Sequence, residues 1–172
     1  MLIENNELTI RAAKLEDAAI LCQWWNDGKI MEHAGFPNGL NTTVEDIRSS
    51  LRKDNLERRR LILEHNNIPI GEMNYRKVEE RVVQIGIKIC VFDQQEKGYG
   101  TRFLKMLINY LFNDLHYGKI ILDTNLKNTR AQHVYEKIGF KKIGVRYNAW
   151  NDQLGNPQSV VDYALCRQNY QF

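Results

Sequence analysis

Cysteine, proline and long apolar runs are all scarce in this chain. Its 172 residues include only three prolines and three cysteines, and no two of the cysteines form a Cys-x-x-Cys pair. The thiols of Cys22, Cys90 and Cys166 cannot all pair with one another, which argues against a disulfide framework and favours a reducing compartment. We also expect no metal site.

Signals for export, membranes and nucleic acids are missing as well. No stretch approaches the about 18 consecutive apolar residues of a membrane-spanning helix. The N-terminal segment around Glu4 and Glu7 has neither the basic nor the apolar region of an export signal. Lys and Arg total 24 against 21 Asp and Glu, and this net charge of +3 is too small and too scattered for a nucleic-acid binder. We therefore expect a cytoplasmic protein, a monomer or homodimer, with no membrane and no nucleic-acid partner.

The chain does contain an alternation of strand-like and helix-like segments, without a repeat or a low-complexity linker. This pattern and the length predict one mixed α/β domain over residues 1–172. Helices are predicted to begin near Lys14, Thr43, Gly98 and Asn128. Strands are predicted at 8–11, 61–64, 68–75, 82–91, 119–124, 141–148 and 160–167.

The connections between these elements are mostly polar. A long loop is expected over 26–41 and a turn over 151–157. We expect the charged run 57–60 to end the second helix as a solvated face, and Gly118 to cap the helix that begins near Gly98.

The most informative segment is Gln-Glu-Lys-Gly-Tyr-Gly-Thr at residues 95–101. It follows a predicted strand and opens an amphipathic helix, whose first N–H groups lack intrahelical partners and favour an anion. Gly98 and Gly100 have no side chain that would hold a pyrophosphate away, while Lys97 and Arg102 add positive charge and Thr101 a hydroxyl donor. The segment therefore predicts a pyrophosphate site.

Other glycine-loop interpretations fit less well. A nucleotide P-loop needs Gly-x-x-x-x-Gly-Lys-Ser/Thr, which the chain does not contain. The dinucleotide fingerprint needs a third glycine where Phe103 stands, although Asp123 lies at about the distance of a ribose-binding acid. That fingerprint normally opens a domain, whereas about half of this chain precedes the loop. A glycine turn without a ligand remains the structural alternative.

Read together with two later motifs, the segment resembles the GNAT superfamily of acyl-CoA-dependent N-acyltransferases. Residues 95–100 match its Arg/Gln-x-x-Gly-x-Gly/Ala loop, and Asn-Leu-Lys-Asn-Thr-Arg-Ala at 125–131 is similar to its strand-end asparagine and following helix start. Tyr-x-x-x-Gly-Phe at 135–140 matches its closing signature. The order and spacing agree over about 82–140, and the flanks look like the branch of ribosomal-protein N-terminal, polyamine and aminoglycoside acetyltransferases.

The resemblance implies an α/β (α+β) fold with a mixed, mostly antiparallel central sheet and helices on both faces. It also implies an enzyme that transfers an acetyl group from acetyl-CoA, without a metal, to a primary amine by direct attack in a ternary complex. The acceptor would be a small-molecule amine or a protein N-terminus. A catalytically silent acyl-CoA-binding sensor or interaction module is the alternative function.

Site residues follow from the same motifs and from the chemistry. The resemblance assigns Tyr135 as the acid that protonates the departing thiolate, and a phenol does hold its proton at neutral pH; a core tyrosine is the alternative. Glu72, on a predicted central strand, is the candidate base. The residues expected to contact the coenzyme are Ile89, Val91, Gln95, Glu96, Lys97, Gly98, Tyr99, Gly100, Thr101, Arg102 and Asn128.

The acceptor side has no motif of its own. Glu32 in the long early loop and Asp152 in the late turn are predicted to attract a cationic amine, since loops on a rigid scaffold commonly carry specificity. Both carboxylates are equally consistent with solvated surface positions. Cys90 has no His partner in the sequence and is predicted to be a small core residue and no nucleophile.

Overall fold

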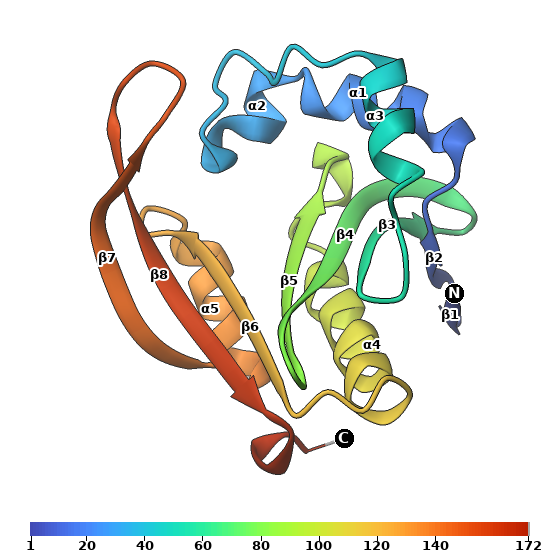
Figure 1. Ribbon diagram of the computed structural model, residues 1–172, viewed down its shortest axis with the longest axis vertical. Coiled ribbons are helices and arrows are strands. Elements are labelled where there is room, and N and C mark those ends of the chain that lie inside the picture. The colour runs from blue at the N-terminus through green and yellow to red at the C-terminus, as the bar shows by residue number, and fades with distance from the viewer. Residues whose placement is uncertain (172) are drawn as a thin grey trace.

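One eight-stranded sheet organises the chain (Figure 1). A computed structural model describes residues 1–171, and its strands lie in the order β1-β2-β3-β4-β5-β6-β8-β7. Only β5 and β6 pair in parallel; every other neighbouring pair is antiparallel. The mixed, mostly antiparallel sheet predicted from the sequence is confirmed. Its strands are β1 (Leu2–Asn5), β2 (Leu8–Ala12), β3 (Arg58–His65), β4 (Ile68–Glu79), β5 (Val82–Ile89), β6 (Lys119–Asn125), β7 (Lys141–Asn151) and β8 (Pro157–Cys166).

Helices cover both faces of the sheet. The alternation of side chains along β3 sends Leu61 and Leu63 into a core with α4 and α5, and sends Ile62 into a second core with α1 and α3. The helices are α1 (Ala18–Trp25), α2 (Gly28–Met31), α3 (Val44–Leu51), α4 (Tyr99–Asn113) and α5 (Thr129–Ile138). None of the helices in residues 1–171 is long and apolar enough to cross a membrane.

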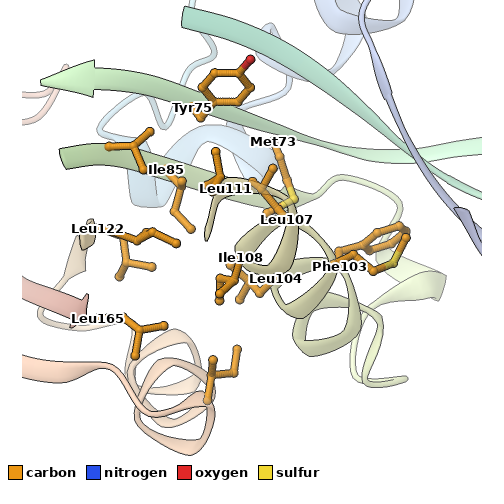
Figure 2. Close-up of a cluster of buried hydrophobic side chains, with 14 of the residues drawn as sticks. Met73, Tyr75, Ile85, Phe103, Leu104, Leu107, Ile108, Leu111, Leu122 and Leu165 are labelled. Atoms are coloured by element: carbon orange, nitrogen blue, oxygen red, sulfur yellow. The ribbon is translucent and has the colours of Figure 1, made fainter. Parts of the chain in front are cut away.

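The longest helix, α4, is fixed by an apolar stripe with the helical period. Phe103, Leu104, Leu107, Ile108 and Leu111 recur every three or four residues and are at most 1% exposed. Figure 2 shows this stripe facing side chains of β4, β5, β6 and β8. Burying five such side chains holds the start of α4, and with it the glycine segment, against the sheet.

Several local predictions were wrong. The loop predicted over 26–41 contains α2 and the short 3-10 helix η2 (Glu32–Ala34), and Thr43 caps a helix that already ends at Leu51. The charged run therefore does not end that helix, because three of its arginines begin β3. Gly118 does not cap α4 either: α4 ends at Asn113, with Asp114 as its C-cap.

The sheet splits at its centre. β5 and β6 pair only from Val82 to Gln84 with Lys119 to Ile121, although both strands continue beyond these residues. Figure 1 shows the two strands diverging toward the end of the molecule that carries α1 and α2. Past Gln84 the facing edge of β5 has no partner strand, which leaves backbone groups free to bind a ligand.

Candidate active site

A cavity of about 760 Å³ lies where β5 and β6 diverge. One wall comes from Gly86 to Ile89 of β5 and the other from Asp123 to Asn125 of β6. The start of α4 closes one end of the cavity, while α5 contributes Tyr135. The cavity thus joins the predicted pyrophosphate loop to the predicted acid.

The glycine segment forms an open cradle at the start of α4. Gly98 is the N-cap residue, with a φ of 78° that an L side chain rarely adopts. A Cβ added at Gly98 or at Gly100 meets no atom within 4 Å, so both backbones are open to a ligand. Tyr99 and Thr101 line the same end of the cavity. Exposed first-turn N–H groups without a covering side chain are the geometry that binds phosphate.

Gln95 and Arg130 tie this cradle to both walls. The Gln95 amide donates to the Ile89 carbonyl over 3.0 Å and accepts from Arg130 over 3.1 Å. Arg130 also lies 3.4 Å from Glu96, and all four residues line the cavity. Sequence reasoning assigned no role to Arg130, although it stands inside the quoted motif of residues 125–131; its guanidinium contacts Gln95 and Glu96 of the glycine segment.

Three residues predicted to contact the coenzyme lie outside the cavity lining. Lys97 is exposed beside the loop, and Arg102 forms an ion pair with Glu7. The Val91 N–H donates to the Ile70 carbonyl over 3.1 Å, and its own carbonyl accepts from Gln94 over 2.9 Å. The backbone of Val91 is therefore already engaged, whereas Ile89 does line the cavity.

Asn128 caps a helix and also lines the main cavity. Its side chain caps α5 by accepting from the Ala131 N–H over 3.2 Å, and the residue also lines the cavity. The capping interpretation from the sequence is confirmed, and the cap leaves its side-chain NH₂ group free to donate.

Tyr135 is buried in the cavity wall. It is 7% exposed, and its ring packs against those of Phe140 and Tyr163 with centroids 6.0 and 5.7 Å away. Burial, with the negative charge of Asp123 nearby, raises the pKa of its phenol well above the ordinary value. Its hydroxyl makes no hydrogen bond to any residue in 1–171. The group is thus protonated at neutral pH and free to donate.

Asp123 places a carboxylate beside Tyr135. Although 44% of its side-chain surface is accessible, partial burial and the neighbouring Asp162 raise the pKa of this carboxyl. Arg146 opposes that shift; it binds Asp162 through two hydrogen bonds of 2.7 and 2.8 Å and lies 3.5 Å from Asp123. From the sequence, Asp123 was weighed only as a ribose-binding acid.

Glu72 lies in a different environment from that of a free base. It is 5% exposed, and its two oxygens accept from the Trp25 indole and the Arg60 guanidinium, each over 2.8 Å. Lys88 lies 3.8 Å from the same carboxylate. Glu72 lines a second cavity and not the main one. Because both oxygens are occupied, Glu72 is poorly placed to take a proton from an amine.

The second cavity, of about 310 Å³, adjoins the first. Gly86, Ile87 and Lys88 line both. The remaining wall is mostly apolar, with Asn74, Arg60 and Glu72 as its polar members. Its other residues are Trp25, Met31, Phe36 and Leu40.

The two predicted acceptor carboxylates differ in position. Glu32 lines the main cavity with 57% of its side chain exposed. Asp152 does not line it: its carboxylate accepts hydrogen bonds within its own turn, from the Leu154 and Asn156 N–H groups over 2.9 Å and from the Gln158 amide over 3.0 Å. Asp152 holds the turn together and does not face the cavity.

Other reactive groups are inert or absent in the described chain. Burial raises the pKa of the Cys90 thiol, and this side chain is 3% exposed in the second core, which confirms its core interpretation. Within residues 1–171 no cluster of three or more His, Cys, Asp or Glu side chains could hold a metal ion.

Comparisons with known proteins agree with this geometry. The acetyltransferase (GNAT) domain family matches residues 7–141 of the chain. An aminoglycoside N(6')-acetyltransferase type 1 from Klebsiella pneumoniae is 28% identical over 155 residues, which cover 81% of this chain and 77% of the relative.

Solved structures show the same fold. A spermidine N-acetyltransferase from Vibrio cholerae, in complex with CoA and spermine, superposes with a TM-score of 0.86 at 23% identity, over 96% of this chain and 99% of that one. A ribosomal alpha-N-protein acetyltransferase in complex with coenzyme A gives 0.84 at 18% identity, over 96% and 98%.

Proposed function

The chain belongs to the GNAT acetyltransferase family and is an N-acetyltransferase that uses acetyl-CoA; on that premise we propose that it acetylates a primary amine by direct attack on the thioester in a ternary complex. The observation that carries the proposal is the continuity of the main cavity. It runs from the phosphate cradle at Gly98 and Gly100, along the unpaired edge of β5, to the free hydroxyl of Tyr135.

The coenzyme contacts follow from the order of groups along that cavity. First-turn N–H groups of α4 and the guanidinium of Arg130 hold the pyrophosphate. The unpaired backbone of β5 near Ile87 binds the pantetheine amides as an added strand would, since the Ile89 carbonyl already accepts from Gln95. The thioester then lies beside Tyr135. Arg102 and Lys97 lie outside the cavity lining and contribute only long-range positive charge.

The chemistry needs two proton transfers. The amine nitrogen attacks the thioester carbonyl carbon, and its proton passes to the Asp123 carboxylate directly or through a water. When the tetrahedral intermediate collapses, the C–S bond breaks and the Tyr135 phenol protonates the departing sulfur, so that an amide and coenzyme A leave. We assign Asp123 as the base in place of Glu72, because Asp123 lines the same cavity as Tyr135 and Glu72 is covered by its donors.

Two measurements, of coenzyme A binding and of acetyl transfer, distinguish an enzyme from a catalytically silent acyl-CoA-binding module. Coenzyme A should raise the melting temperature by mass action, whereas NAD should not. Release of free thiol from acetyl-CoA, measured with a panel of small amines and N-terminal peptides, should identify an accepted amine. Coenzyme A binding without turnover on any amine would contradict the transfer proposal.

A further inference from the structure

Lys88 and Arg60 bring two cations to the second cavity, with Glu72 as the one carboxylate among its lining residues. That carboxylate already accepts from Arg60 and from the Trp25 indole. The cluster keeps one net positive charge, and the side chains of Lys88 and Arg60 remain 26% and 27% exposed. A cationic acceptor group is therefore disfavoured in this cavity.

The donors of both cations are incompletely used within residues 1–171. The Lys88 ammonium has one hydrogen-bond contact, to the thioether of Met31 over 2.9 Å, and a thioether is a weak acceptor. The guanidinium of Arg60 donates one N–H to Glu72 and stacks over the Trp25 ring, 4.8 Å from its centroid. The Asn74 side chain in the same wall makes no hydrogen bond to the described chain. These donors line a cavity whose one carboxylate, that of Glu72, already accepts from Arg60 and from Trp25.

We propose that the second cavity binds an anionic group of the acceptor, a carboxylate or a phosphate, through Lys88, with Arg60 and Asn74 in support. Resting on the proposed function, this makes the acceptor an amine whose molecule also carries a negative charge. Lys88 lines both cavities, so an anion on its ammonium lies at their junction and directs the amine toward the thioester. The apolar wall of Trp25, Met31 and Phe36 accommodates an apolar body.

Matched pairs of amines, one with and one without an anionic group, test the proposal. Leucine and isoamylamine differ only by a carboxylate, and phosphoethanolamine and ethanolamine only by a phosphate. The protein saturated with coenzyme A is titrated with each amine by calorimetry. In at least one pair the member that carries the anionic group should bind tenfold or more tightly than the amine that lacks it, since hydrogen bonds to charged groups are the strong ones. The pair that shows the preference identifies the anion.

Lys88→Met provides the matched variant, because it keeps the length of the side chain and removes the charge. It should abolish the preference without weakening the binding of the amine that lacks the anionic group. Lys105→Met, on the exposed face of α4 and outside both cavities, makes the same charge change and should keep the preference. Circular dichroism and the coenzyme A-induced shift establish that both variants fold.

Two results would overturn the inference: equal or tighter binding, in both pairs, of the amine that lacks the anionic group, or an undiminished preference in Lys88→Met. Failure of the transfer proposal looks different. In that case the amine with the anionic group still binds the coenzyme A complex through Lys88, but no thiol is released from acetyl-CoA.

Discussion

The two ends of the active-site region are built in opposite ways. The proposed coenzyme end draws most of its phosphate-binding groups from two short contiguous stretches, residues 95–101 and 128–135, and its attraction for anions comes largely from the backbone N–H groups at the start of α4. The proposed acceptor end comes from α1, β3, β4 and β5, and its charge comes from the side chains of Arg60, Glu72 and Lys88.

This difference explains which part of the site a sequence reveals. A backbone cradle needs glycine at fixed positions, which leaves a motif that can be recognised in one stretch of chain. A side-chain cluster needs only that distant residues meet, and any of several residue types can serve at each position. The coenzyme site can therefore be predicted from the sequence, whereas the proposed acceptor site can be found only in the folded structure. Substitutions at the two ends, and at the junction between them, should therefore differ in which substrate's kinetics they change.

The largest expected effect lies where the two ends meet, at Tyr135. Tyr135→Phe keeps the ring between Phe140 and Tyr163 and removes the acid, so kcat should fall on the order of 100-fold with little change in the acetyl-CoA affinity. Tyr75→Phe is the matched control: its hydroxyl is buried, unpartnered in residues 1–171 and outside the main cavity. It should keep full turnover. Near-normal turnover of Tyr135→Phe, with chemistry rate-limiting, would return Tyr135 to a packing role.

Asp123 should control the acid side of the pH profile. A general base is active when deprotonated, so kcat/KM should fall as the pH drops through the pKa of Asp123, which lies above the usual aspartate range. Asp123→Asn should lower kcat about 100-fold or less and remove that inflection. An acid limb that persists unchanged in Asp123→Asn would assign it to another group, for instance the acceptor amine itself.

At the coenzyme end, Gly100 is a cleaner probe than Gly98. A side chain at Gly98 would strain a backbone with a φ of 78°, whereas Gly100 has no positive φ and open space around it. Gly100→Val should weaken coenzyme A binding about tenfold, roughly 1.4 kcal/mol, by displacing the phosphate. The acceptor KM should stay nearly constant. Unaltered coenzyme A affinity in the folded variant would contradict the cradle assignment.

The smallest effect is expected from Glu32, an exposed carboxylate at the rim. Glu32→Gln should raise the KM of the amine only about two- to fivefold, because water and salt screen the interactions of an exposed charge. The KM of acetyl-CoA should not move. Asp152→Asn is the comparison, and it should leave both KM values unchanged because that carboxylate serves its own turn. Equal effects from the two variants would mean that the whole surface field, and not Glu32, attracts the amine.

Predictability from sequence followed the same division. The apolar period of Phe103 to Leu111 located α4, and the register of Tyr135 to Phe140 located α5, because both signals are local. The run of arginines before Leu61 was mistaken for a solvated helix end. Nothing nearby in sequence indicates that Arg60 meets Glu72 and Trp25, 12 and 35 positions away in the chain.

Two residues at the coenzyme end, Arg130 and Asp123, were missed although both lie in segments that the sequence analysis discussed. Arg130 stands inside a motif that had been recognised, and its separation from Gln95 along the chain hid the contact. Asp123 was visible at a strand end but was interpreted through a dinucleotide fingerprint. The divergence of β5 from β6 is what turns both residues toward one cavity, and strand divergence leaves no residue pattern of its own.

Initial rates measured with acetyl-CoA and an accepted amine varied together test most directly whether the two ends act in one complex. The adjoining cavities predict intersecting double-reciprocal lines, and protein incubated with acetyl-CoA alone should keep its unmodified mass. Parallel lines together with an acetylated protein would contradict direct transfer, because they require the acetyl group to reside on the enzyme before the amine binds.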